Sequence, residues 1–162
     1  KILLAESVPI TDLKRVLELL SNINISKMSI VEISEIIRPA LVGLLIQKIC
    51  PINKELSVIT LSPEMEQIII NALKEKNTTG ISLDPTFTKN MLTAIAKAYE
   101  TASSKGDNCI LLTSPIIRKD LANLIRQNIE DLHVLAFTEL PETRRINIIA
   151  TIENKIQEEK NK

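Results

Sequence analysis

The sequence predicts a mixed fold of the α+β or α/β type, with a helical N-terminal part followed by a small α/β part that contains a mixed sheet of about four strands. In the first third of the chain, apolar residues recur at helical spacing. From about residue 56, short β-type runs alternate with helical stretches. Three of these helical stretches open with a serine or aspartate followed by proline, a strong signal for a helix start.

The composition limits the classes of protein to which the chain can belong. The chain of 162 residues is long enough for one ordinary domain or two small packed ones, and 44% of its residues are apolar. Its 20 basic and 20 acidic residues cancel, whereas nucleic-acid binding depends on a basic surface that neutralises phosphates. Only 2% of the residues are aromatic, so stacking platforms for single strands or an RNA-binding sheet are also disfavoured.

The cysteines, the apolar runs and the N-terminus add three expectations. Cys50 and Cys109 lack metal-ligand or redox-motif spacing, so we expect two buried thiols in a reducing cytosol, with a disulfide as the alternative. No apolar run reaches the roughly 18–20 residues of a membrane span. The chain begins at Lys1 on an apolar stretch already in progress, which we interpret as a cut inside a longer protein.

The first third predicts two helices. The first runs from about residue 8 to residue 20, with Pro9 in its first turn, where the missing N–H costs nothing. The second opens with Ser29 and Glu32 at capping-box spacing and continues to about residue 49. Pro39 lies in its middle and should kink it or split it in two.

The second part predicts strands and helices in the order β-α-α-β-α-β-β. Strands separated by helices should be parallel neighbours, whereas the last two, joined by about eight residues, should form an antiparallel hairpin. A loop is expected at 77–81. The expected strands cover 58–61, 109–113, 133–137 and 146–152, and the helices cover 63–76, 85–104 and a stretch from 115. The resulting division is 1–55 helical, 56–152 α/β and 153–162 a charged tail.

The search for chemistry finds no catalytic or metal-binding arrangement. His133 is the only histidine, and Ser114 precedes a proline as a helix cap rather than a nucleophile in a G-x-S-x-G turn. A metal site needs three or four suitably spaced ligands, and a phosphate loop needs glycines that this chain lacks. We therefore predict no enzyme activity, no metal and no cofactor. The alternative, a small hydrolase or thioredoxin-like α/β enzyme, is disfavoured by the isolated histidine and the missing CxxC.

Four ordered blocks carry a family resemblance. Residues 4–18 (LAESVPITDLKRVLE) resemble the L-x-E-x-V-P-I-R-D-L-x-x-I-L-E stretch of the FlhA/InvA/LcrD family. Residues 58–66 (VITLSPEME), 111–118 (LLTSPIIR) and 131–140 (DLHVLAFTEL) resemble three further family blocks in the same order. The chain departs from the family pattern at Thr11, where an arginine is usual, and at Pro39 in the second helix.

The resemblance implies a function that composition does not show. The family forms the large export-gate subunit of bacterial type III secretion, in flagella and in virulence-associated injectisomes. Its members have a membrane-spanning part in the inner membrane and a cytoplasmic part of four subdomains, of which this chain resembles the last two. The third subdomain contributes contacts within a ring, usually nonameric, and the fourth borders a cleft for chaperone–substrate complexes.

Candidate interaction residues follow from this resemblance. If Val8, Ile10, Leu13 and Leu17 pack inside, then Thr11, Asp12 and Arg15 are the exposed candidates for the subunit interface. Candidates for partner docking are Arg118, Glu139, Arg144 and Arg145. The implied partners are identical subunits, export chaperones, secreted substrates and other export-apparatus proteins. The composition disfavours nucleic acid as a partner. The resemblance implies contact with the membrane only through the missing N-terminal part, so this piece is expected at the cytoplasmic face of the inner membrane.

Overall fold

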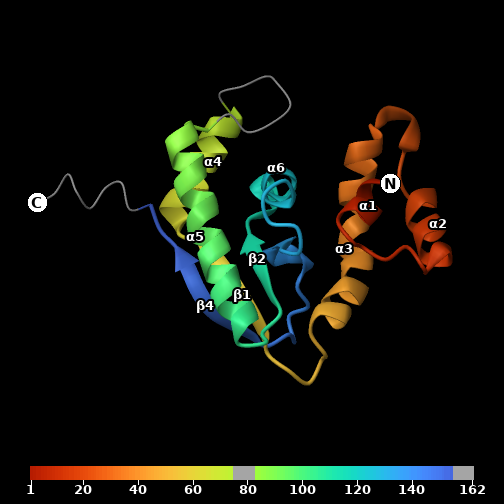
Figure 1. Cartoon of the computed structure of the whole chain (residues 1–162). Helices are drawn as coiled ribbons and strands as arrows, with labels where there is room; N and C mark the ends of the chain where they lie inside the picture. The colour runs from red at the N-terminus through yellow and green to blue at the C-terminus, as the bar shows by residue number, and fades with distance from the viewer. Residues whose placement is uncertain (75–82, 155–162) are drawn as a thin grey trace, which may run out of the picture.

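The computed structural model describes residues 1–74 and 83–154 (Figure 1). The loop expected at 77–81, the last residues of the helix expected to reach 76, and most of the charged tail lie outside the described residues. Within them, none of the helices combines the length and the apolar character that a membrane crossing requires.

The N-terminal part is helical, as predicted. Its elements are α1 (Ile2–Ala5), α2 (Leu13–Ser21), the 3-10 helix η1 (Ile25–Lys27) and the long helix α3 (Ile30–Ile49). The capping box at the start of α3 is confirmed. The Glu32 N–H donates to Ser29 Oγ at 3.2 Å, and the Ser29 N–H donates to Glu32 Oε2 at 2.7 Å.

Three details of this part differ from the prediction. Helix α2 begins at Leu13 and not near Pro9, because the Asp12 side chain caps it by accepting from the Arg15 N–H at 3.0 Å. Pro9 therefore lies before the helix. Pro39 does not split α3, which runs continuously through it. The short helix α1 was not predicted, since four residues are too few for a periodic pattern.

The sheet has four parallel strands in the order β3-β2-β1-β4. They are β1 (Leu56–Leu61), β2 (Cys109–Thr113), β3 (His133–Ala136) and β4 (Ile146–Ile152). The predicted hairpin of the last two strands is wrong, because β4 pairs with β1 at the opposite edge from β3. Residues 137–145, which include the 3-10 helix η2 (Phe137–Glu139), make this crossing.

Helices cover both faces of the sheet, as parallel strands require (Figure 1). Helices α4 (Pro63–Lys74), α5 (Pro85–Ser104) and α6 (Pro115–Arg126) share a core with Ile59 and Leu111. Helix α3 packs on the other face, against Val58 and Ile110. The mixed α/β fold class is thus confirmed. The boundary near residue 55 stays a prediction, because α3 shares its core with the sheet.

Candidate interaction surfaces

Helix α2 presents two leucines to the surface. Leu13 is 61% exposed and Leu17 is 66% exposed, so the expectation that both pack inside is wrong. Val8 is buried, as expected, and Ile10 is partly buried. The inner face of α2 consists instead of Val16, Leu19 and Leu20, which pack against the core shared with α3.

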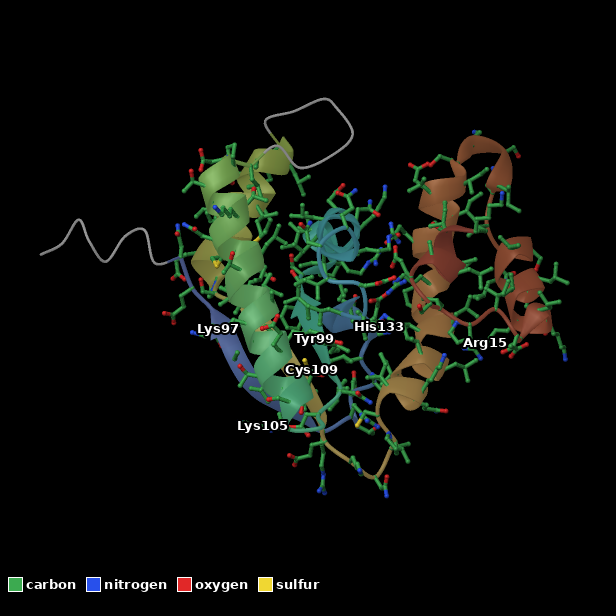
Figure 2. The ribbon with its side chains drawn as sticks, in the orientation of Figure 1. Arg15, Lys97, Tyr99, Lys105, Cys109 and His133 are labelled. Carbon is green, nitrogen blue, oxygen red and sulfur yellow. The ribbon has the colours of Figure 1, made fainter. Side chains whose placement is uncertain are left out.

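The three candidate interface residues lie on the same exposed segment. Thr11, Asp12 and Arg15 are all exposed, and Figure 2 labels Arg15 on α2. We call Thr11, Asp12, Leu13, Arg15 and Leu17 the α2 surface. Exposed apolar side chains beside polar ones are typical of protein–protein contacts. The α2 surface therefore presents apolar and charged side chains together to solvent.

A buried ion-pair network joins the N-terminal helices to the far end of the chain. Arg38 of α3 pairs through Nη1 with Glu6 Oε2 and through Nε with Glu139 Oε1, each at 2.6 Å. Only 2% of the Arg38 side chain and 3% of the Glu139 side chain are exposed. Glu139 also accepts the Ala136 N–H at 2.8 Å, which fixes η2 at the end of β3.

Arg118 of α6 completes the network. Its Nη1 lies 2.7 Å from Glu6 Oε2, and its Nη2 donates to both carboxylate oxygens of Glu35 at 2.7 and 2.6 Å. Burial by itself would lower the pKa of Arg118, but the charge of Glu6 and the hydrogen bonds to Glu35 outweigh it and raise that pKa. The network ties α3 to α6 through Glu6 and Glu35, and it ties α3 to η2 through the pair of Arg38 and Glu139.

Two of the docking candidates predicted from the sequence belong to this buried network. Arg118 and Glu139 are buried and have their partners inside the molecule. A docking role for either would require the network to open and leave charges unpaired, which is costly. Both residues therefore have an evident structural role and no accessible surface for a partner.

The neighbouring candidates Arg144 and Arg145 differ from each other. Arg144 is half-buried, and its Nη2 donates to the carbonyl oxygens of Cys50 and Pro51 at 2.9 and 3.0 Å. It fastens the loop after α3 to the segment before β4. Arg145 is exposed. Of the four docking candidates, Arg145 thus presents the most accessible charge.

The residues considered for chemistry are not assembled into a reactive site. Cys50 and Cys109 are buried free thiols, as expected. Burial raises the pKa of the Cys109 thiol to about 11, so it stays protonated at neutral pH. Burial lowers the pKa of His133. Ser114 lies at the N-cap of α6 as predicted, although its side chain makes no cap hydrogen bond. Within residues 1–74 and 83–154, no three potential ligands gather into a metal site.

Sequence reasoning missed three members of the network: Glu6, Glu35 and Arg38. One signal was available, because Arg38 interrupts the otherwise apolar run of residues 36–46 on a helix that buries most of its surface. A charged residue at such a position needs a buried partner. Which carboxylates provide it depends on the tertiary fold.

The fold is a helical part packed on a four-stranded parallel sheet, with the exposed α2 surface on the helical part. The chain belongs to the FHIPEP family, whose model matches residues 1–145. It is 32% identical over 152 residues to the flagellar biosynthesis protein FlhA of Buchnera aphidicola from Acyrthosiphon pisum, covering 92% of this chain and 21% of that protein. It is 27% identical over 151 residues to the invasion protein InvA of Salmonella typhimurium, covering 93% of this chain and 22% of InvA. The chain thus spans about a fifth of these relatives.

Solved structures show the same fold. The Chlamydia pneumoniae CdsV protein matches with a TM-score of 0.78 at 26% identity, over 94% of this chain and 44% of that one. CdsV in its complex with CdsO matches with a TM-score of 0.73 at 25% identity, over 91% and 43%. Nonameric EPEC SctV-C matches with a TM-score of 0.78 at 20% identity, over 93% and 45%, which is a likeness of fold. The predicted family is therefore confirmed.

Proposed function

We propose that this chain is the ring-forming and docking part of the export gate of a bacterial type III protein secretion system, flagellar or injectisome. In this proposal it lies at the cytoplasmic face of the inner membrane, attached to a membrane-spanning part. It contacts identical subunits and binds chaperone–substrate complexes, which it hands to the export pore. The role requires binding and no catalysis.

The observation that carries the proposal is the α2 surface. Leu13 and Leu17 project into solvent although the same helix packs three other apolar residues inward. Exposing two leucines side by side favours association, because burying one such side chain contributes about 1.5–3 kcal/mol. When a patch on one protomer binds a different patch on its neighbour, every contact adds the same rotation between subunits. If these rotations add up to a full circle, the subunits form a closed ring.

The relatives support the choice of system. Family membership covers most of the chain, and both flagellar FlhA and virulence-associated InvA are among the relatives. A chain of similar fold is a nonamer, and CdsV forms a complex with CdsO. We therefore extend the partners of this chain, as a proposal, to identical subunits and to other export-apparatus proteins.

Ring formation can be tested on the complete cytoplasmic region. We expect the parent to sediment as a large assembly, and Leu13→Asp combined with Leu17→Asp to abolish that assembly in sedimentation velocity, because the double change places two charges in the contact. The control is Ile116→Asp, which alters a residue on α6 that is similarly exposed, at 65%. If the double variant sediments like the parent and the control, the α2 surface is not the ring contact.

Docking can be tested by calorimetry with the export chaperones of the same organism. We expect micromolar binding by the complete cytoplasmic region and loss of most of that binding in this chain alone, because the family resemblance implies that the chaperone pocket lies mainly in the preceding subdomains. Nanomolar binding by this chain alone would contradict that placement.

A further inference from the structure

A groove of about 860 Å³ runs between α5 and β4. One wall is α5, and the other is six consecutive residues, 149–154, of which the first four are the end of β4 and the last two follow it. Figure 2 shows α5 beside β4 and labels Lys97 on α5 and Lys105 directly after it. Successive side chains of a strand point to opposite faces of the sheet. A groove lined by four strand residues in a row, and by the two residues that follow them, therefore runs along the edge of the strand and not along one of its faces.

The edge of β4 along this groove has backbone N–H and carbonyl groups that the pairing with β1 does not involve. Strand β4 is the last strand of the sheet, and in the described part of the chain it pairs only with β1. The Ile152 carbonyl faces β1, since it accepts the Ser62 N–H at 2.8 Å. Backbone groups of successive strand residues point to alternate sides, so the N–H and carbonyl of Thr151 point outward. They are placed to bond another strand.

The walls and floor of the groove indicate the chemistry of its occupant. The floor is apolar and includes Met91, Ala94, Ala98 and Ile149. Three lysines, Lys89, Lys97 and Lys105, line the α5 wall, which is about 24 Å long between the first and the last of them. Two carboxylates, Asp107 and Glu153, also line the groove. The helix wall is thus basic, and an occupant with carboxylates facing α5 would complement it.

We propose that this groove binds an extended peptide segment of another protein, with alternating apolar and acidic side chains, as a fifth strand beside β4. The backbone of Thr151 supplies the strand pairing, the apolar floor receives alternate side chains, and the lysines of α5 pair with the acidic ones. The four lining residues of β4 correspond to about 13 Å of strand, so the strand pairing involves about four residues of the segment. This site lies apart from the α2 surface, and it stands whether or not the chain forms rings.

The pairing can be tested with a fluorescein-labelled heptapeptide of alternating glutamate and valine, titrated with this chain in fluorescence anisotropy. Thr151→Pro removes the outward N–H while leaving the pairing with β1, so we expect at least a tenfold loss of affinity. Thr151→Val is the matched control. It removes the 3.1 Å contact between the Thr151 and Thr60 hydroxyls but keeps the N–H, and it should bind as the parent does. Equal binding by both variants would overturn the strand pairing.

A second pair of variants tests the proposed attraction between the lysines and the acidic side chains of the peptide. This test does not depend on how well the chain tolerates proline. Lys97→Glu should weaken binding of the same peptide about tenfold at low salt, and the loss should shrink as salt is added. Lys27→Glu makes the same charge change at an exposed residue of η1 and should leave binding unchanged. Failure of the peptide to bind the parent chain would overturn the proposal. So would dimerisation of this chain that Thr151→Pro abolishes, because the groove would then hold a second copy.

Discussion

The guanidinium of Arg38 and the carboxylate of Glu139 meet at 2.6 Å, although the two residues are 101 positions apart in the sequence. Both side chains are almost completely buried. Replacing one partner leaves the other charge buried and unpaired. We expect Arg38→Ala to lower the free energy of unfolding by about 3–5 kcal/mol in urea denaturation.

The control for this prediction is an exposed ion pair. Lys14 and Glu18 lie 3.8 Å apart on α2, with side chains that are 88% and 62% exposed. Lys14→Ala should change the unfolding free energy by less than about 0.5 kcal/mol, because water screens such pairs. If the two variants were equally stable, the buried network would not contribute to the stability of the fold.

The capping box of α3 gives a smaller and more local prediction. Ser29→Ala removes the oxygen that accepts the Glu32 N–H, so we expect a loss of about 1 kcal/mol in the free energy of unfolding. Ser29→Asp keeps an acceptor at the N-cap and should retain most of the stability. Thermal unfolding followed by circular dichroism distinguishes the two, and equal destabilisation by both would contradict a capping role.

The helix starts were the most predictable features of this chain. Ser29, Asp84 and Ser114 each precede a helix where expected, because capping depends on a few neighbouring residues. The β4 strand itself was also found, but its partner was not. Pairing with β1 rather than β3 depends on the path of residues 137–145, and local spacing carries no information about that path.

The exposure of the candidate interaction residues was also predicted correctly only where the signal is local in the sequence. The exposure of Thr11, Asp12 and Arg15 was predicted, yet it was predicted together with burial of Leu13 and Leu17, which are exposed. The apolar stripe in the sequence does not say which of its two edges faces the core, and the helix begins at Leu13, four residues after Pro9. Arg118 looked like a surface charge because its partners, Glu6 and Glu35, are distant in sequence.

The protonated state of Cys109 leads to a chemical prediction. A thiol that is 3% exposed, with a pKa of about 11, should react slowly with a disulfide reagent at pH 8, because the thiolate is the reactive form. In a Cys50→Ser variant, which leaves Cys109 as the single thiol, we expect modification in native buffer to be at least tenfold slower than in denaturing urea. Equal rates would show that Cys109 is accessible in the folded chain.

The lowered pKa of His133 leads to a prediction about how the stability of the chain depends on pH. Burial lowers its pKa below the ordinary value of about 6.5, so the folded chain holds this side chain neutral where the unfolded chain protonates it. Its contribution to stability is therefore present above the unfolded pKa and is lost as the pH falls through about 6.5 toward the folded pKa. We expect His133→Gln to flatten the slope of unfolding free energy between about pH 5 and 7. An unchanged slope, measured by urea denaturation across that range, would assign the pH dependence to other groups.

Variants of the neighbouring residues Arg144 and Arg145 distinguish a structural role from a docking role. Arg144 donates to two carbonyl oxygens of the loop after α3, whereas Arg145 is exposed. Arg144→Ala should lower the free energy of unfolding by about 1.5–3 kcal/mol, in line with charged hydrogen bonds, while Arg145→Ala should stay within about 0.5 kcal/mol. In chaperone titrations of the complete cytoplasmic region, Arg145→Glu should weaken binding without altering the melting temperature. If instead Arg145→Glu binds normally and only Arg144 variants fail, the effect on binding arises from the loop that Arg144 fastens, and Arg145 is not a docking residue.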